Sequence, residues 1–171
     1  MKQAVLIILC GLAAALIQGA LLYVGVPSYL LPQLVLILVI YLGFHEVSLL
    51  GAFSAFALGL LMDFASAVLV GPWAGAFVAV YGALSVGSQR LFVESSIVMI
   101  VTAFCASLCA DFIFLGLAYE FQPSGASYLM EAIGQAFATA MVAPVVMPIF
   151  SKVLRRKVVP ALGRVGAVGI A

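Results

Sequence analysis

Long apolar runs separated by short polar or turn-forming segments dominate the pattern of this chain. Most runs approach the ~20 residues that a helix needs to cross a bilayer, and they lack the alternation of a transmembrane β-strand. Helices also satisfy their own backbone hydrogen bonds, which lipid requires. The pattern predicts six transmembrane helices, at about residues 4–24, 29–44, 47–63, 73–88, 96–119 and 129–150, followed by a basic tail at 151–171.

The breaks between the runs contain turn-forming or polar residues. Proline after glycine at Gly71-Pro72 is typical of a helix start, because proline suits the first helical position. The first run resembles the apolar core of a signal peptide, but it continues to Val24 and is long enough to span, so we expect a transmembrane helix. The breaks are residues 25–28, 45–46, 71–73, 88–95 and 120–127.

Composition supports a membrane protein with one domain. Of the 171 residues, 67% are hydrophobic and 8% are charged, whereas soluble domains carry about 25% charged residues. The net charge of +1 gives no sign of nucleic-acid binding. Three cysteines lie within apolar runs, at a spacing that fits neither a disulfide framework nor a thiolate metal site. They are Cys10, Cys105 and Cys109.

The distribution of basic residues predicts the orientation. With six spans, all seven fall on one side of the membrane, and lysine and arginine concentrate in the cytoplasm. We therefore expect both termini to be cytoplasmic. The cluster Lys152–Lys157 could contact anionic lipid or a partner, but an orientation signal and headgroup anchor is the simpler interpretation. The seven are Lys2, Arg90, Lys152, Arg155, Arg156, Lys157 and Arg164.

Asp63 is a lone carboxylate in a strongly apolar region. Gly59, Ala55 and Gly51 precede it at intervals of four, so they share one helix face with it. Stripes of small residues let membrane helices approach closely. This face is expected to pack against span four or against a partner helix.

The position of Asp63 suggests what binds it. It lies at the C-terminal end of its own helix, where the dipole disfavours an anion. Span four begins across the turn at Gly71 and Pro72, and its free N–H groups favour an anion. We expect Asp63 to stay ionised and to accept N–H bonds there or from the turn. A role in a partner or ligand pocket is the alternative.

Asp111 lies deeper, within span five, with no basic residue on the same span. It is expected to be protonated, to be hydrogen-bonded by polar residues of neighbouring helices, or to face a wet cavity. The candidate partners are Gln18, Gln33 and Gln135.

Two other polar residues have simpler interpretations. Glu131 is expected to be a first-turn acid of span six, favoured by the dipole. His45 is expected to be a hydrated loop residue, because no second metal ligand is nearby.

Signatures of catalysis are missing from the sequence. It contains no phosphate-binding loop, no HExxH, no GxSxG and no Cys/His cluster. The single histidine offers no evident nucleophile–base pair. We expect a protein that is not an enzyme and that has neither cofactor nor metal.

A segment from about residue 30 to 90 resembles the MreD family of bacterial rod-shape proteins. The resemblance rests on Pro32, on Tyr41, and on "GAFSAFALGLLMDF" with its Gly-Leu-Leu-x-Asp element at Gly59–Asp63. It continues through the apolar turn to Gly71 and the helix ending "YGALSVGSQR". The His-Glu turn departs from the family, whose members often carry proline or a basic residue there.

The resemblance implies a non-catalytic scaffold in the bacterial inner membrane. Its direct partner would be MreC, and the wider complex would contain RodA, a penicillin-binding transpeptidase, RodZ and MreB. It also implies a six-helix fold similar to the substrate-binding subunits of energy-coupling-factor vitamin transporters, and such a subunit is the alternative function. A vitamin pocket needs several polar side chains near the outer face. The chain has no asparagine and one tryptophan, which favours the scaffold.

Overall fold

The chain is an all-α membrane protein. A computed structural model describes residues 2–66, 70–87, 96–118 and 125–154, and those residues contain no β-strand. A short 3-10 helix, η1 (Ser28–Leu30), precedes the second α-helix. The α-helices are α1 (Lys2–Tyr23), α2 (Leu34–His45), α3 (Leu49–Ser66), α4 (Pro72–Gly87), α5 (Ser96–Leu117) and α6 (Gly125–Leu154).

Five helical segments are long and apolar enough to cross a membrane: α1, Ser28–His45, α3, α5 and α6. The fourth helix, α4, has 16 residues and is about 24 Å long at 1.5 Å per residue. This is shorter than a hydrocarbon core of about 30 Å. The six expected helices are therefore present, but α4 is short.

The second span is not one continuous helix, as the range 29–44 predicted. Pro32 has no N–H, and its ring disfavours helical backbone at the residue before it. Leu31 is accordingly extended, with φ −81° and ψ 112°, and α2 begins only at Leu34. This break leaves the backbone N–H of Gln33 free to bond outside its own helix.

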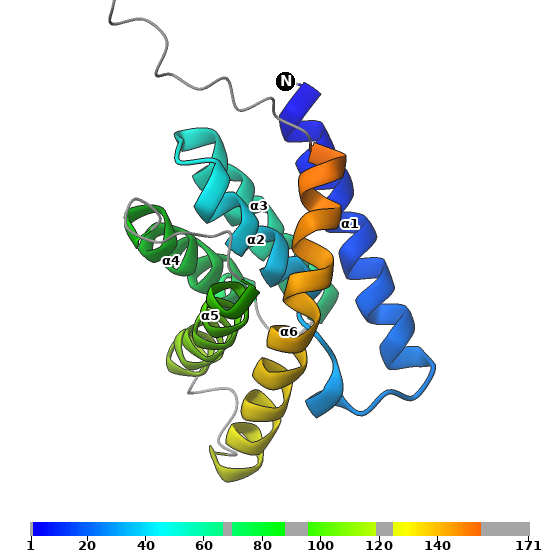
Figure 1. The fold of residues 1–171 in the computed structure, drawn as a ribbon. Coiled ribbons are helices and arrows are strands. Elements are labelled where there is room, and N and C mark those ends of the chain that lie inside the picture. Colours follow the sequence, from blue (N-terminus) through cyan, green and yellow to red (C-terminus); the bar gives the residue numbers. More distant parts are fainter. Residues whose placement is uncertain (1, 67–69, 88–95, 119–124, 155–171) are drawn as a thin grey trace, which may run out of the picture.

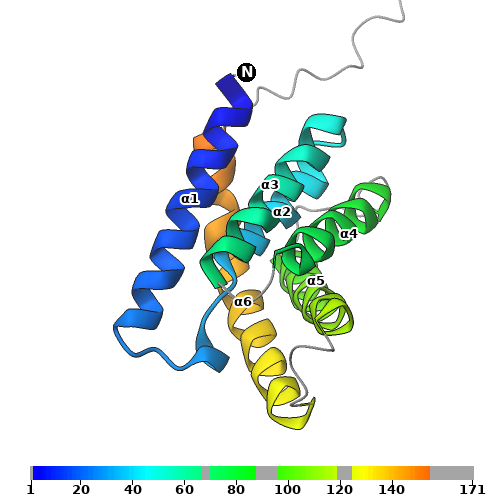
Figure 2. The ribbon, with the colours of Figure 1, turned by 180° about the vertical axis from the view of Figure 1, so that it is seen from behind.

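The α2 helix forms the centre of the fold. All residues from Leu34 to Gly43 are buried, and α1, α3, α4, α5 and α6 all contact α2. Figure 1 and the reverse view in Figure 2 show the other helices around it. A continuous apolar run without a polar face fits this central position, because such a helix is buried on every side.

The α1 helix lies at the edge of the bundle and is attached along a narrow seam (Figure 2). The buried residues of α1 in that seam are Ile7, Gly11, Ala14 and Gln18. Gly11 contributes through its small size, because a Cβ there would overlap the side chain of Leu58 in α3. Most of the remaining α1 surface is apolar and exposed.

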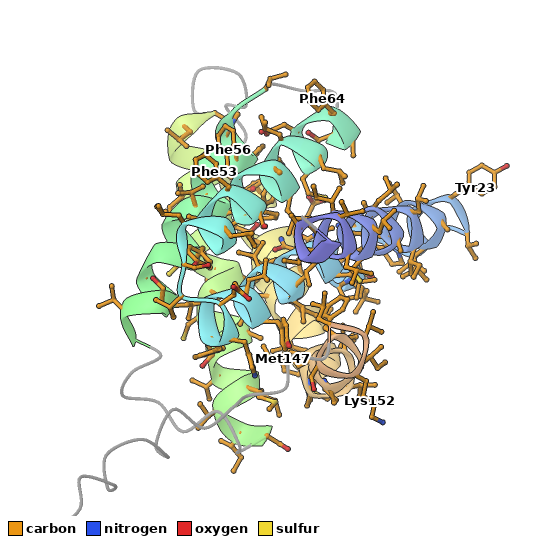
Figure 3. The ribbon with its side chains drawn as sticks, turned by 90° about the horizontal axis from the view of Figure 1, so that it is seen from above. Tyr23, Phe53, Phe56, Phe64, Met147 and Lys152 are labelled. Carbon is orange, nitrogen blue, oxygen red and sulfur yellow. The ribbon has the colours of Figure 1, made fainter. Side chains whose placement is uncertain are left out.

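Large apolar side chains point outward from the bundle, as Figure 3 shows for four of them. Their exposed fractions would be unusual on a water-soluble protein, which rarely leaves large apolar patches uncovered. In a bilayer they face lipid. The four are Tyr23, Phe53, Phe56 and Phe64.

The α6 helix is longer than the predicted range of 129–150. It starts at Gly125 and continues to Leu154, despite prolines at 144 and 148. The predicted basic tail at 151–171 therefore begins inside the helix, and its residues 155–171 lie outside the described part of the chain. Glu131 is consequently not a first-turn acid, as the sequence suggested. It accepts a hydrogen bond from the Ser28 hydroxyl at 3.1 Å.

Candidate functional site

The carboxylate of Asp63 caps the beginning of α4. Its Oδ1 accepts the N–H of Trp73 at 2.9 Å, and its Oδ2 accepts those of Gly71 at 2.9 Å and Ala74 at 3.2 Å. Pro72 stands between these donors and has no N–H to offer. The prediction that Asp63 binds the start of span four is confirmed. A helix N-terminus carries positive partial charge, which explains why an anion is held there.

Gly71 provides the sharp turn into α4. Its φ of +125° lies in a region that residues with a Cβ rarely adopt, so glycine is required by the backbone. The first helical hydrogen bond then forms from the Gly75 N–H to the Gly71 carbonyl at 2.9 Å.

The small-residue stripe of α3 packs against α4 inside this chain. At Gly59, an added Cβ would lie 2.8 Å from the Ala74 nitrogen and 2.8 Å from the Trp73 carbonyl oxygen. Ala55 is fully buried. Of the two predicted partners, span four or a foreign helix, the structure therefore selects span four, and the stripe is not available to another protein.

Tyr81 fixes the opposite end of the same helix pair, and sequence reasoning did not single it out. Its hydroxyl contacts the Glu46 carbonyl, lies 3.0 Å from the Ser48 carbonyl, and accepts the Ser48 N–H at 3.2 Å. A Cβ at Gly51 would overlap this hydroxyl. The sequence shows only that span four carries a tyrosine, and it does not indicate which residue that tyrosine contacts.

Asp111 belongs to a second buried polar cluster, centred on Gln33. The Gln33 side-chain nitrogen donates to Asp111 Oδ1 at 2.9 Å and to Gln135 Oε1 at 3.0 Å. Ser107 donates to Gln33 Oε1 at 3.3 Å, and the Gln33 N–H donates to Thr139 Oγ1 at 3.0 Å. The sequence named Gln33 as a candidate partner correctly, but it did not show that one residue joins α2, α5 and α6.

Asp111 and Asp63 differ in how many of their carboxylate oxygens accept a hydrogen bond. Asp111 Oδ2 is buried and has no hydrogen-bond partner among the described residues. The two aspartates are both almost completely buried, at 2% and 1% exposed. Asp63 therefore has donors on both oxygens, whereas Asp111 has a donor on one.

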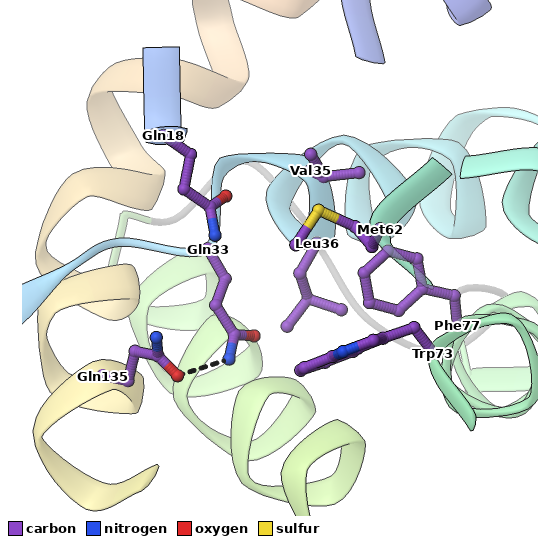
Figure 4. Close-up of a pocket in the computed structure, with 8 residues that line it drawn as sticks. All are labelled: Gln18, Gln33, Val35, Leu36, Met62, Trp73, Phe77 and Gln135. Atoms are coloured by element: carbon purple, nitrogen blue, oxygen red, sulfur yellow. Dashed lines mark hydrogen bonds between the residues drawn. The ribbon is translucent and has the colours of Figure 1, made fainter. Parts of the chain in front are cut away.

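A small cavity lies between the two clusters (Figure 4). Its volume is about 40 Å³. Trp73, whose N–H binds Asp63, forms one wall, and Gln33, which binds Asp111, forms another. Gln18 of α1 reaches the same cavity, and no hydrogen bond joins it to Asp111 among the described residues.

The other polar candidates lie elsewhere. His45 is exposed, as expected, but it is the last residue of helix α2 and not a loop residue. Its Nδ1 lies 3.1 Å from the Tyr41 carbonyl, and its ring stacks on Tyr41. In the described parts of the chain, no group of three or more His, Cys, Asp or Glu side chains is placed to hold a metal ion. Among the described residues, no serine or histidine side chain is hydrogen-bonded to either aspartate carboxylate, and the Ser66 hydroxyl donates to the backbone carbonyl of Asp63 at 3.0 Å.

Comparison with protein-family models, with curated proteins and with solved structures finds no match for this chain. Both clusters use their polar atoms to connect helices, which is a structural task.

Proposed function

We propose that this protein is a non-catalytic membrane scaffold of a bacterial cell-wall elongation complex, as its resemblance to the MreD family implies. MreC would be the direct partner. RodA, a penicillin-binding transpeptidase, RodZ and MreB would belong to the wider assembly. The bacterial inner membrane would be its location, with both termini cytoplasmic.

The main support for the proposal is that the Gly-Leu-Leu-x-Asp element joins α3 to α4. Gly59 seats α4 directly on α3, and Asp63 binds three backbone N–H groups at the start of α4. The residues that carry the resemblance thus build a rigid joint between two helices. A joint of this kind suits a protein that shapes a surface for a partner.

The alternative, a vitamin-binding transporter subunit, is less well supported. Pockets for small organic ligands have volumes of about 300–1,000 Å³ and several convergent polar groups. The cavity lined by the three glutamines has a volume of about 40 Å³. It is too small for a vitamin. Two larger pockets, of about 440 and 410 Å³, are lined by described residues. The first, between α4 and α5, has an almost wholly apolar lining and lacks convergent polar groups. The second lies beside His45 and Ser151, at the opposite end of the bundle from the Asp63 cap.

The proposed orientation agrees with the arrangement of the helix ends. The beginning of α1, the turn between α2 and α3, and the end of α6 lie at the same end of the bundle (Figure 1). Lys2 and Lys152, both near that end, are then cytoplasmic. The Asp63 cap lies toward the periplasmic side, where the large part of MreC would be found.

The proposal is tested by purification from native membranes. A tagged copy, expressed at its native level in the host bacterium, is solubilised in mild detergent, and the proteins recovered with it are identified by mass spectrometry. We expect MreC to be enriched, and depletion of the protein to turn rod-shaped cells round. Recovery of a transporter ATPase module without MreC would contradict the scaffold function and support the alternative.

A further inference from the structure

The cavity beside Gln33 has an unusually polar wall for the interior of a membrane protein. Three of its eight lining residues are glutamines: Gln18 of α1, Gln33, which immediately precedes α2, and Gln135 of α6. Figure 4 shows them on one side, with Trp73 and Phe77 on the other. Apolar cavities stay dry, whereas a polar wall supplies the hydrogen-bonding groups that hold buried water.

Gln18 is the residue of this polar wall whose side-chain oxygen lacks a hydrogen-bond partner among the described residues. It is 8% exposed, and its Oε1 is buried. An amide without partners in an apolar environment is costly, and an aliphatic residue would have suited the α1 seam better. Because the terminal torsion of glutamine is soft, Gln18 can present either its oxygen or its nitrogen to the cavity.

The size of the cavity limits what can bind there. A buried water molecule needs at least about 10–15 Å³, so a cavity of about 40 Å³ has room for water. Organic ligands need far more space. Water can both donate and accept, which matches a wall of carboxamides that offer both kinds of group.

We propose that this cavity is a binding site for ordered water, which joins Gln18 of α1 to the Gln33 cluster. No direct hydrogen bond links Gln18 to Gln33 or Gln135 in the described residues. The water supplies that link. It gives the peripheral helix α1 a polar attachment to α2 and α6 in addition to its apolar seam. The site does not depend on the proposed scaffold function.

X-ray footprinting of the full-length protein in lipid nanodiscs tests the site. Radiolysis produces hydroxyl radicals where water is bound, so a reactive side chain beside buried water is oxidised even when lipid excludes bulk solvent. Met62 lines the cavity and is the probe. Val35→Ile adds a methylene to the cavity wall, and Gln18→Leu removes the amide. Val39→Ile is the matched control, since Val39 is fully buried one turn further along α2 and does not line the cavity.

We expect rapid oxidation of Met62 in the wild type and in Val39→Ile, and loss of most of that oxidation in Val35→Ile and in Gln18→Leu. The two cavity variants act by different means, so one that fails to fold leaves the other informative. Slow oxidation of Met62 in the wild type would mean that the cavity is dry. Equal oxidation in all four proteins would mean that the radicals come from bulk water. Either result overturns the proposal.

Discussion

Asp63 and Trp73 meet across the turn between α3 and α4, where the carboxylate Oδ1 accepts the Trp73 N–H at 2.9 Å. The same Trp73 ring stacks on Phe114 of α5, with ring centroids 4.6 Å apart. The cap therefore positions more than the start of one helix. It also fixes an aromatic residue of α4 that packs against α5.

Replacing Asp63 should destabilise the fold in a graded way. Asp63→Asn keeps the size and one acceptor oxygen, so it should be milder than Asp63→Leu, which leaves three donors without their acceptor. An unpaired buried donor costs roughly 1–3 kcal/mol. Thermal unfolding of the purified variants measures the difference. If the protein has the proposed scaffold function, MreC recovery should fall in the same order.

Two outcomes would contradict this view of Asp63. Full rod shape both in cells carrying Asp63→Asn and in cells carrying Asp63→Leu would make the cap dispensable. Loss of function in Asp63→Asn with the complex still assembled would point to charge or proton chemistry instead of a structural cap.

Close packing of the α3 stripe against α4 predicts that alanine substitution has different effects on stability at two helical glycines, Gly59 and Gly82. Gly59→Ala should lower the free energy of unfolding, because the new Cβ would meet the backbone of Ala74 and Trp73. Gly82→Ala, on α4, has no atom within 4 Å of its new Cβ. It should be neutral or stabilising by up to about 1 kcal/mol, since alanine is the better helix former. Equal melting temperatures for the two variants would show that α3 and α4 do not pack closely.

Gln33 and Asp111 should respond very differently to substitution, although they are hydrogen-bonded to each other. Gln33→Leu removes the side-chain bonds to Asp111, Gln135 and Ser107, and it should cost several times the roughly 1 kcal/mol of a typical hydrogen bond. Asp111→Asn keeps the acceptor that Gln33 uses and should change stability little. Denaturation in detergent, followed by circular dichroism, compares them. A large loss in Asp111→Asn with a small one in Gln33→Leu would reverse the assigned roles.

Cysteine labelling tests the orientation. In a variant lacking the three native cysteines, a cysteine at Ser124, between α5 and α6, should react with an impermeant thiol reagent in intact spheroplasts. A cysteine introduced at Ser151, near the end of α6, should react only after lysis. Labelling in the opposite order would invert the topology and place the Asp63 cap on the cytoplasmic side.

The sequence by itself determined that the fold consists of six apolar helices, although not where α2 begins or how far α6 extends. Apolar runs long enough to span a bilayer predict helices whatever their neighbours, because lipid leaves no other way to satisfy the backbone. The Asp63 cap was also predictable, because it is a local feature of the chain. Asp63 and its donors lie within eleven residues of each other, so local chain geometry and the dipoles of two helix ends were sufficient.

Only the tertiary structure decided which helices share each polar residue. Gln33 meets Asp111 and Gln135 from 78 and 102 positions away in the chain, and Tyr81 meets Glu46 from 35. Three glutamines were candidates for Asp111, and nothing local distinguished them. The break at Pro32 turned the backbone of Gln33 toward α6, and α2 took the centre of the bundle. Helix packing, which periodicity does not encode, therefore selected Gln33 as the residue that joins α2, α5 and α6, and placed Gln18 at the cavity.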